Sequence, residues 1–256
     1  MSSLLGIELP FYSYGILMGL AFILGVALFR YNARRSELPV PSWIDLVLVL
    51  SISGVVGARI NYILLFPQYY HSLRDCLAIH EGGLVFYGGM IAAILSLAVF
   101  CKIKGYSFST VADYMIPSLA LGHAMGRIGC LINDCCYGAG TEVIRIYHLK
   151  KDPIGFYRHP TQLYEMIYLI LLAIGFSILF KTNWQEKPQN RGVSAGIYVI
   201  LYGVLRFINE YFRADARGGF ITQLHLSPAQ VTSIILAVCA IIWIIICRKR
   251  NKLIAE

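Results

Sequence analysis

Long apolar runs separated by short polar segments dominate the chain. Seven of these runs are about 20 residues long, the length of helix that crosses a hydrocarbon core about 30 Å thick. They are predicted at residues 12–29, 44–66, 83–101, 114–132, 163–180, 193–212 and 227–247. The alternating strands of a transmembrane β-barrel do not occur, and in lipid a helix satisfies its own backbone hydrogen bonds. We therefore expect an all-α polytopic integral membrane protein with a seven-helix transmembrane bundle.

Composition supports this assignment. Of the 256 residues, 57% are hydrophobic and 14% are charged, whereas a soluble domain averages roughly 45–50% and about 25%. A soluble globule and a disordered chain are thereby excluded. The N-terminus lacks the basic segment and cleavage site of a signal peptide, so we expect the first run to be retained as a span. A single domain over residues 1–256 is predicted, with a short outer-face segment at 139–160.

The loop charges predict an orientation. Twelve Lys and Arg residues fall on one side of the predicted bundle and seven on the other. The larger set comprises Arg30, Arg34, Arg35, Lys102, Lys104, Lys181, Lys187, Arg191, Arg248, Lys249, Arg250 and Lys252. Positive loops face the cytoplasm, so the N-terminus is expected outside and the C-terminus inside. The net charge of +8 is then explained by loops and anionic lipid. No basic block with interleaved aromatic residues occurs, so a nucleic-acid partner is not expected.

Three arginines remain within predicted spans: Arg59, Arg127 and Arg206. A charge at the bilayer centre costs roughly 3 kcal/mol or more, so such residues face a partner or a watery cavity. One interpretation is a structural ion pair with a carboxylate such as Glu165 or Glu210. Three arginines together with these acids and Asp134 instead favour a polar chamber inside the bundle.

Such a chamber suits a phosphate group. Arginine donates forked hydrogen bonds to phosphate and stays charged when partly desolvated. Nearby glycines, in Gly126-Arg127-Ile128-Gly129 and Tyr137-Gly138, allow close approach of a ligand. The hypothesis is an intramembrane pocket for an anionic phospholipid, which serves an enzyme and a lipid transporter equally well.

Six short motifs occur in order along the chain. They are Tyr14-Gly15, Gly57-Ala58-Arg59-Ile60, Glu81-Gly82-Gly83-Leu84-Val85-Phe86-Tyr87-Gly88-Gly89, Gly126-Arg127-Ile128-Gly129, Arg158-His159-Pro160-Thr161-Gln162-Leu163-Tyr164-Glu165, and Tyr202 followed by Arg206, Glu210 and Arg213. In kind and order they resemble those of bacterial prolipoprotein diacylglyceryl transferase, a multi-pass enzyme of the inner (plasma) membrane. That family moves diacylglyceryl from phosphatidylglycerol to the thiol of a lipobox cysteine in a preprolipoprotein, releasing glycerol-1-phosphate.

The resemblance implies roles for particular residues. Arg127 and Arg206 are expected to hold the phosphate of phosphatidylglycerol or a similar anionic phospholipid, with Glu210 in support. Further lipid-binding or catalytic positions are Tyr14, Tyr87, Asn133, Gly138 and Tyr202. Neither a soluble cofactor nor a metal ion is implied by the resemblance.

Departures from the family pattern concern the acceptor half of the reaction. Tyr87 stands where the family has a histidine, and a phenol, with an ordinary pKa near 10, is a poor base at neutral pH. His123 lies one helical turn before Arg127 and could remove the acceptor proton. Alternatively, His123 only bonds a neighbouring span, or the two arginines hold a thiolate without any base. The outer segment 139–160 also looks shorter than the family's head region.

Cys130, Cys135 and Cys136 form a second departure, because the first two replace a family asparagine and glutamate. Three interpretations stay open. A structural zinc site needs four ligands, which the nearby chain does not supply, so no metal site is expected. Packing or an outer-face disulfide suits an oxidising compartment. Finally, Cys130 or Cys135 could be a reactive thiol that accepts or carries a lipid group.

Two functions other than lipoprotein modification remain under consideration. A related transferase could use the same donor with a lipid or small-molecule acceptor, or the chain could be a non-catalytic lipid-binding or transport protein. Arg206, Glu210 and Arg213 share one helical face, which serves either a phosphate site or a simple charge ladder that stabilises the helix.

Overall fold

The computed structural model describes residues 2–4, 7–9, 13–34, 41–70, 72–78, 82–149, 152–153, 155–184, 187–214 and 226–255. A short antiparallel hairpin comes first, made of β1 (Ser2–Leu4) and β2 (Ile7–Leu9). The helices that follow are α1 (Ser13–Ala33), α2 (Trp43–Leu65), η1 (Pro67–Tyr69), α3 (Leu73–Leu77), α4 (Phe86–Lys104), α5 (Phe108–Ile132), α6 (Thr161–Phe180), η4 (Pro188–Asn190), α7 (Val193–Glu210) and α8 (Pro228–Ala255). Within this described part, seven helices are long and apolar enough to cross a membrane. The predicted class, an all-α multi-pass membrane protein, is confirmed.

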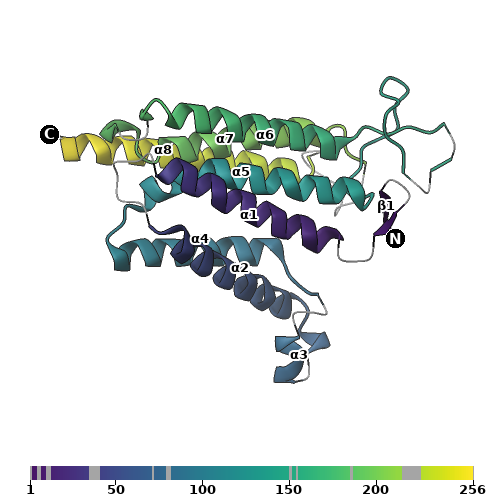
Figure 1. Cartoon of the computed structure of the whole chain (residues 1–256), viewed down its shortest axis with the longest axis horizontal. Helices are drawn as coiled ribbons and strands as arrows, with labels where there is room; N and C mark the ends of the chain where they lie inside the picture. Colours follow the sequence, from purple (N-terminus) through teal and green to yellow (C-terminus); the bar gives the residue numbers. More distant parts are fainter. Residues whose placement is uncertain are drawn as a thin grey trace. The chain divides into compact units, whose positions relative to one another are not determined.

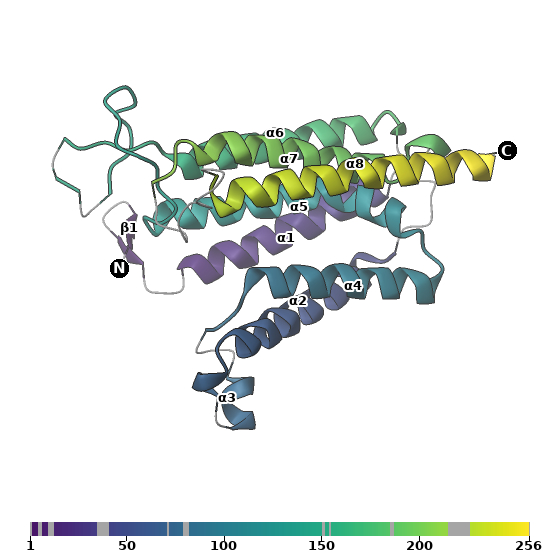
Figure 2. The ribbon, with the colours of Figure 1, turned by 180° about the vertical axis from the view of Figure 1, so that it is seen from behind.

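The chain divides into two compact units. Unit 1 comprises Met1–Glu37 and Ala112–Glu256, and unit 2 comprises Leu38–Val111. In unit 1, α1, α5, α6, α7 and α8 run alongside one another (Figures 1 and 2). In unit 2, α2 lies along α4, and α3 follows the end of α2 (Figure 1). The single domain expected over the whole chain stays a prediction.

Small residues allow the two long helices of unit 2 to approach closely. A Cβ on Gly57 of α2 would lie 2.6 Å from the carbonyl oxygen of Gly88, and one on Gly88 would lie 2.5 Å from that of Gly57. Because lipid supplies no hydrophobic drive between helices, such close backbone packing is a main source of association energy. The glycines of two family-like motifs therefore have a packing role in unit 2.

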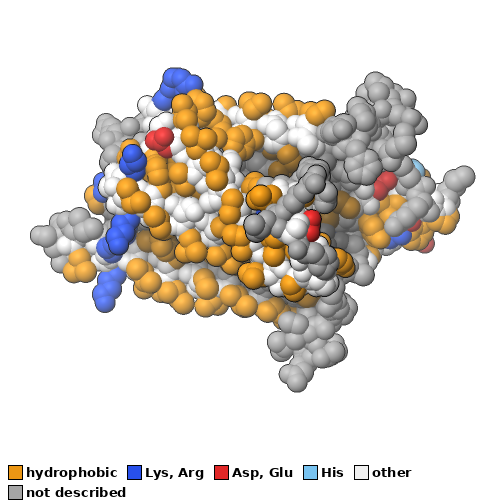
Figure 3. Space-filling model, turned by 90° about the horizontal axis from the view of Figure 1, so that it is seen from below, with side chains coloured by type: hydrophobic (Ala, Val, Ile, Leu, Met, Phe, Trp, Pro, Cys, Tyr) orange, Lys and Arg blue, Asp and Glu red, His pale blue; other side chains and the backbone are white. Residues whose placement is uncertain are grey.

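The core of unit 1 is formed where three helices meet. Buried Ile116 and Ala120 of α5 pack with Ala173 and Phe176 of α6 and with Tyr198 of α7. The outward faces carry exposed Ile, Leu and Val side chains, and Figure 3 shows hydrophobic side chains over much of the visible face. Apolar side chains directed both inward and outward are what a bilayer-embedded bundle requires.

Helix ends differ from the predicted spans where polar or glycine residues decide them. α4 begins at Phe86 rather than at residue 83, because Gly82 and Gly83 adopt φ values of +90° and +76°. α5 begins at Phe108, six residues before the predicted start. Its first turns include Asp113, whose side chain is fully buried within the protein. An acidic residue that is shielded from lipid in this way is compatible with a membrane-spanning helix.

Asp113 anchors the start of α7. Its carboxylate accepts hydrogen bonds from the backbone nitrogens of Gly192 (2.6 Å) and Ala195 (2.8 Å), groups that have no partner within the helix itself. Trp243 of α8 donates to the Gly192 carbonyl at 2.7 Å. The N-terminal end of α7 is thereby tied to α5 and α8, which fixes where its later turns lie.

Candidate functional site

A short backbone clamp brings the ends of α5, α6 and α7 together. Gly138 donates its N–H to the carbonyl of His159 before α6 (3.0 Å), and Ala139 donates to that of Phe212 after α7 (2.8 Å). Gly138 also forms a β-bridge with Arg213. A Cβ on Gly138 would lie 2.5 Å from the His159 oxygen and 2.6 Å from the Phe212 oxygen, so only glycine fits.

The segment that follows the clamp is folded around an ion pair. Arg158 donates to both carboxylate oxygens of Asp152 (2.6 and 2.9 Å) and lies over the rings of Tyr137 (4.8 Å) and Phe156 (5.0 Å). These hydrogen bonds raise the pKa of Arg158. Burial raises the pKa of Tyr147 to about 12, and its hydroxyl approaches Asp134 at 3.5 Å. The described part of segment 139–160 therefore packs back onto the end of α5.

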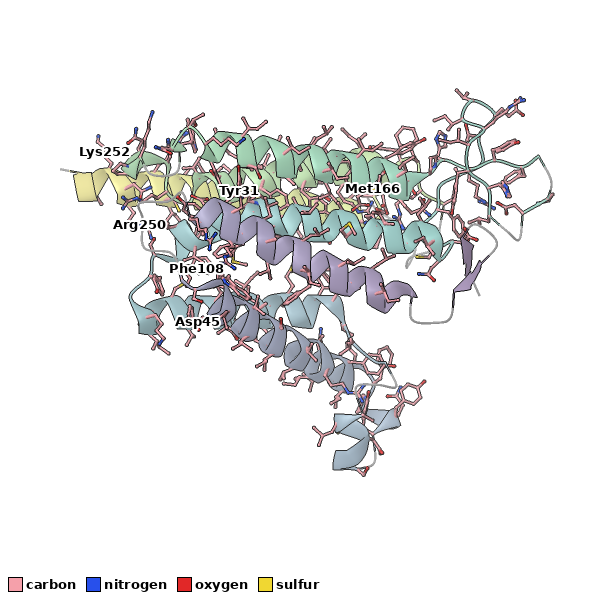
Figure 4. All side chains as sticks on the ribbon, viewed as in Figure 1. Tyr31, Asp45, Phe108, Met166, Arg250 and Lys252 are labelled. Atoms are coloured by element: carbon pink, nitrogen blue, oxygen red, sulfur yellow. The ribbon has the colours of Figure 1, made fainter. Side chains whose placement is uncertain are left out.

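Glu165 of α6 is the centre of a buried ion cluster. Its fully buried carboxylate lies 2.8 Å from Arg127 Nη2 of α5. Tyr202 of α7 donates its hydroxyl to Oε1 (3.2 Å), and Asn209 donates to Oε2 (3.4 Å). Met166, which is labelled in Figure 4, directly follows Glu165 in α6 and marks where along this helix the cluster lies. Three helices thus share one buried charge.

A second group of charges lies on α7. Glu210 Oε2 is 2.5 Å from Arg206 Nη1 and 3.5 Å from Arg213 Nε, so the predicted charge ladder is present. Tyr202 interacts electrostatically with Arg127 and with Arg206, which joins the two groups into one cluster. Three guanidinium groups and two carboxylates leave a net charge of +1.

The predicted alternative of structural ion pairs is thus also realised, because Arg127 and Arg206 each have an acidic neighbour. The pairing is nevertheless incomplete at Arg127. Its Nε is buried and has no hydrogen-bond partner among the residues that the structure describes. An unpaired buried donor is costly, whereas a singly charged phosphodiester would satisfy it and neutralise the cluster.

His123 lies inside this cluster, one turn before Arg127. Its Nε2 is 3.4 Å from Arg127 Nη2 and 3.6 Å from Glu165 Oε1, and its ring packs against Tyr202 with centroids 5.2 Å apart. Nε2 accepts a hydrogen bond from the Arg127 guanidinium in one tautomer and donates to the Glu165 carboxylate in the other. The action of His123 as a base stays a prediction.

Other predicted site residues have contacts of a different kind. Asn133 donates to the Gly129 carbonyl at 2.8 Å, which closes the last turn of α5. Tyr87 belongs to unit 2, where it is exposed and makes an edge contact with the ring of Phe86. Tyr14 lies in α1, but its side chain is outside the described residues.

Arg59 has a structural environment of its own in unit 2. Its five N–H groups face backbone carbonyls: Asp75 and Ala78 from Nη2, Cys76 from Nε, and Gly82 and Gly83 from Nη1, at 2.6 to 3.3 Å. Backbone carbonyls of unit 2 satisfy its guanidinium, and the prediction that it shares a chamber with acidic residues stays a prediction. Arg59 organises the connection between α2 and α4.

The described structure has no disulfide bond among the three clustered cysteines, and the disulfide interpretation stays a prediction. Their sulfur atoms all lie within 4.8 Å of one another. Hydrogen bonding to the Cys130 and Cys136 thiols raises the pKa of Cys135 above its ordinary value. The role of Cys130 or Cys135 as a reactive thiol stays a prediction.

Sequence reasoning named Glu165 but gave no role to the two polar residues that precede it on α6. Thr161 and Gln162 are buried, and they donate to the carbonyls of Cys136 (2.7 Å) and Cys135 (2.6 Å). Glu165 follows at helical spacing on the same face. The sequence does contain an indication of this polar face, because these three polar residues lie at the start of an otherwise apolar span and within one family-like motif.

Known proteins resemble this chain along almost its whole length. The sequence model of a family described as "Prolipoprotein diacylglyceryl transferase" matches residues 3–246. A phosphatidylglycerol–prolipoprotein diacylglyceryl transferase of Pasteurella multocida (strain Pm70) is 36% identical over 84% of this chain and 81% of the relative. One from Bacillus cereus (strain G9842) is 35% identical over 95% and 90%, and transferase 1 of Clostridium perfringens (strain 13 / Type A) is 31% identical over 93% and 91%. With a family-wide match and relatives above 30% identity, this chain belongs to the prolipoprotein diacylglyceryl transferase family.

Proposed function

We propose that the protein transfers the diacylglyceryl group of phosphatidylglycerol to the thiol of a lipobox cysteine in a preprolipoprotein, releasing glycerol-1-phosphate. The names of the relatives support both substrates. The observation that carries the proposal is the buried cluster of three arginines and two glutamates, with its net charge of +1 and an Arg127 Nε that has no hydrogen-bond partner in the described part of the chain.

The donor phosphate is bound between Arg127 and Arg206. A phosphodiester carries one negative charge, which matches the cluster's excess positive charge. Glu165 and Glu210 keep the two guanidinium groups charged and oriented before the lipid binds, and Tyr202 and Asn209 hold Glu165 in place. Such preorganised donors cost little reorganisation when the reaction begins.

The chemical step breaks the bond between glyceryl C3 and the phosphate oxygen. The acceptor thiol releases its proton to solvent or to a base, and its sulfur attacks C3. The bonding electrons leave with glycerol-1-phosphate, which gains a second negative charge. Arg127 and Arg206 neutralise this developing charge, typically the largest electrostatic contribution to such a reaction.

The proposed location is the bacterial inner membrane, with the N-terminus outside and the basic C-terminal tail in the cytoplasm. The excess of Lys and Arg on one set of loops supports this orientation. The clamp at Gly138 and the cluster it positions then lie toward the outer face, where a secreted preprolipoprotein presents its cysteine.

The experiment is a transfer assay with the purified full-length chain in detergent micelles. Phosphatidylglycerol with a labelled acyl chain is mixed with a lipobox peptide, and mass spectrometry detects the thioether product. The peptide with Ser in place of Cys, and phosphatidylethanolamine in place of the donor, are the controls. We expect product only with the thiol peptide and phosphatidylglycerol.

A transferase with the same donor but another acceptor is the second candidate, favoured by Tyr87 and by the cysteines at two family polar positions. It predicts release of glycerol-1-phosphate with a membrane lipid extract but no peptide thioether. Binding of phosphatidylglycerol without any product would instead indicate a lipid-binding or transport protein.

A further inference from the structure

Three thiols converge at the end of α5 in unit 1. The sulfur atoms of Cys130, Cys135 and Cys136 all lie within 4.8 Å of one another. Sulfurs bound to one zinc ion lie about 3.8 Å apart, since each Zn–S bond is about 2.3 Å. Soft thiolate ligands select ions such as zinc, so the cluster has the donor chemistry of a thiophilic metal site.

The backbone that carries these thiols is held rigidly. Buried Gln162 and Thr161 of α6 donate to the carbonyls of Cys135 and Cys136. Asp134 and Cys136 adopt φ values of 49° and 63°, which are uncommon outside glycine. Strain of this kind costs about 1–3 kcal/mol per residue and is concentrated at functional sites. The three sulfurs are therefore positioned by the fold before any ligand binds.

The cluster is open on one side. Cys136 is buried, whereas Cys135 is exposed. Zinc bound by three protein ligands keeps a fourth position for water or substrate, unlike a closed structural site. Gln162 Oε1 is buried and accepts no hydrogen bond from the described residues, which leaves an acceptor beside the Cys135 loop.

The thiols also adjoin the arginine that we assign to the donor phosphate. Cys130 follows Arg127 by three residues in α5, so their side chains are neighbours on the helix surface. The Arg127 guanidinium interacts electrostatically with Cys130 and Cys136. An acceptor held at the thiol cluster would therefore be next to the bond that must break.

We propose that Cys130, Cys135 and Cys136 bind a zinc ion whose fourth ligand is the acceptor thiol. The second part rests on the proposed function. On coordination the acceptor S–H bond releases its proton to solvent, and the metal-bound sulfur attacks glyceryl C3. The C3–O bond breaks, glycerol-1-phosphate leaves with the electron pair, and the neutral thioether, a weaker ligand, dissociates from the ion.

Coordination by the metal ion deprotonates the acceptor thiol, a task for which the phenol of Tyr87 is a poor base. At pH 7 only about 3% of a free thiol with a pKa near 8.5 is thiolate, whereas a thiol that coordinates a metal ion is deprotonated outright. Coordination thus raises the reactive fraction about 30-fold at pH 7. The gain disappears at higher pH, where the free thiol ionises without help.

Cobalt(II) is the spectroscopic probe for the site. Full-length protein, purified with reductant and stripped with a chelator, is titrated with CoCl2, and the near-ultraviolet thiolate-to-cobalt band is recorded. We expect one ion per chain, and Cys135→Ser should weaken its affinity by more than about 100-fold, since even second-sphere changes cost 10–100-fold. Cys239→Ser, which changes an exposed cysteine of α8, is the matched control. A missing band, or equal loss in the two variants, would overturn the proposal.

Addition of the lipobox peptide tests the fourth position. The thiol peptide should shift the cobalt spectrum toward four sulfur ligands, and the serine peptide should not. In the transfer assay with zinc, Cys135→Ser should lower the rate about 30-fold at pH 7 and much less at pH 9. A deficit that is equal at the two pH values would show that Cys135 has only a structural role.

The two proposals fail in different ways. If the transferase assignment is wrong, cobalt still binds but no thioether forms with any variant. If the metal site is wrong, wild type and the variant with Ser at positions 130, 135 and 136 form thioether equally well, with or without chelator. A disulfide among these cysteines in peptide maps of active protein that was purified without reductant would also refute the metal site.

Discussion

Arg59 and Arg127 show that a buried arginine in a membrane helix serves two different ends. Arg59 of unit 2 directs all five N–H groups at backbone carbonyls between α2 and α4 and lies over the ring of Tyr70. Arg127 of unit 1 has a carboxylate partner in Glu165, but its buried Nε donates no hydrogen bond to the described residues. Full satisfaction indicates a structural role, whereas an incomplete set of partners marks a place for a ligand.

The largest expected effect comes from Arg127→Lys. The positive charge beside Glu165 is kept, so a buried carboxylate is not left unpaired. The planar fork and the Nε donor are lost, and they do not return with an ammonium group. We expect transfer to fall about 10²–10³-fold, the usual cost of one preorganised donor, with little change in unfolding temperature. A rate within threefold of wild type would contradict the assignment of Arg127 to the phosphate.

The matched substitution Arg59→Lys should act on stability instead. Lysine has three donors in place of five, so at least two charge-assisted hydrogen bonds to the loop are lost. We expect destabilisation by about 2–3 kcal/mol, measured as a lower unfolding temperature in detergent. The folded fraction should transfer diacylglyceryl at nearly the wild-type rate. If Arg59→Lys instead abolished transfer without lowering stability, the contrast between the two arginines would be wrong.

Gly138→Ala tests whether the clamp positions the arginines of unit 1. The added Cβ would meet two backbone oxygens at 2.5 and 2.6 Å, and these cannot move as a flexible side chain does. We expect about 1–3 kcal/mol of destabilisation from overpacking, together with a loss of transfer, since Phe212 precedes Arg213. Gly155→Ala, in the segment 139–160 that follows the clamp, is the spatial control, because no atom of the described residues lies within 4 Å of its added Cβ, although its φ of +85° adds strain. Equal activity in the two variants would argue against a positioning role for the clamp.

The smallest effect is expected for Tyr202→Phe. The substitution removes one hydrogen bond to the buried Glu165 carboxylate and should cost about 1–2 kcal/mol. Tyr168→Phe is a close control, because the buried Tyr168 hydroxyl has no hydrogen-bond partner in the described part of the chain. Thermal unfolding of the two variants should therefore differ. If the control were the more destabilised, the hydrogen bond to Glu165 would not be the stabilising contact.

Most of the fold could be predicted because a bilayer imposes a simple rule on composition. Seven apolar runs became seven helices, and the ladder of Arg206, Glu210 and Arg213 followed from helical spacing. The first turns of α5 were missed because Asp113 is buried against the start of α7, and no count of apolar residues shows that.

Only part of the candidate site could be predicted in the same way. Arg127, Arg206 and Glu210 were recognised from charge within apolar spans and from motif resemblance. The different environment of Arg59 was not predicted from the sequence, because its partners are backbone carbonyl groups, which every residue has. Asn209 was missed as well, since its amide matters only because α6 brings Glu165 within 3.4 Å.

The sequence by itself determined the membrane class, the seven spans, the family resemblance and the presence of charges that must be compensated. Those properties depend on residue type and on spacing within one helix. The tertiary structure alone decided that Glu165 meets Arg127, that Arg127 Nε has no hydrogen-bond partner among the described residues, and that three thiols converge beside it. Such facts depend on distances between helices and loops far apart in the chain, which hydrophobicity and helical periodicity leave undetermined.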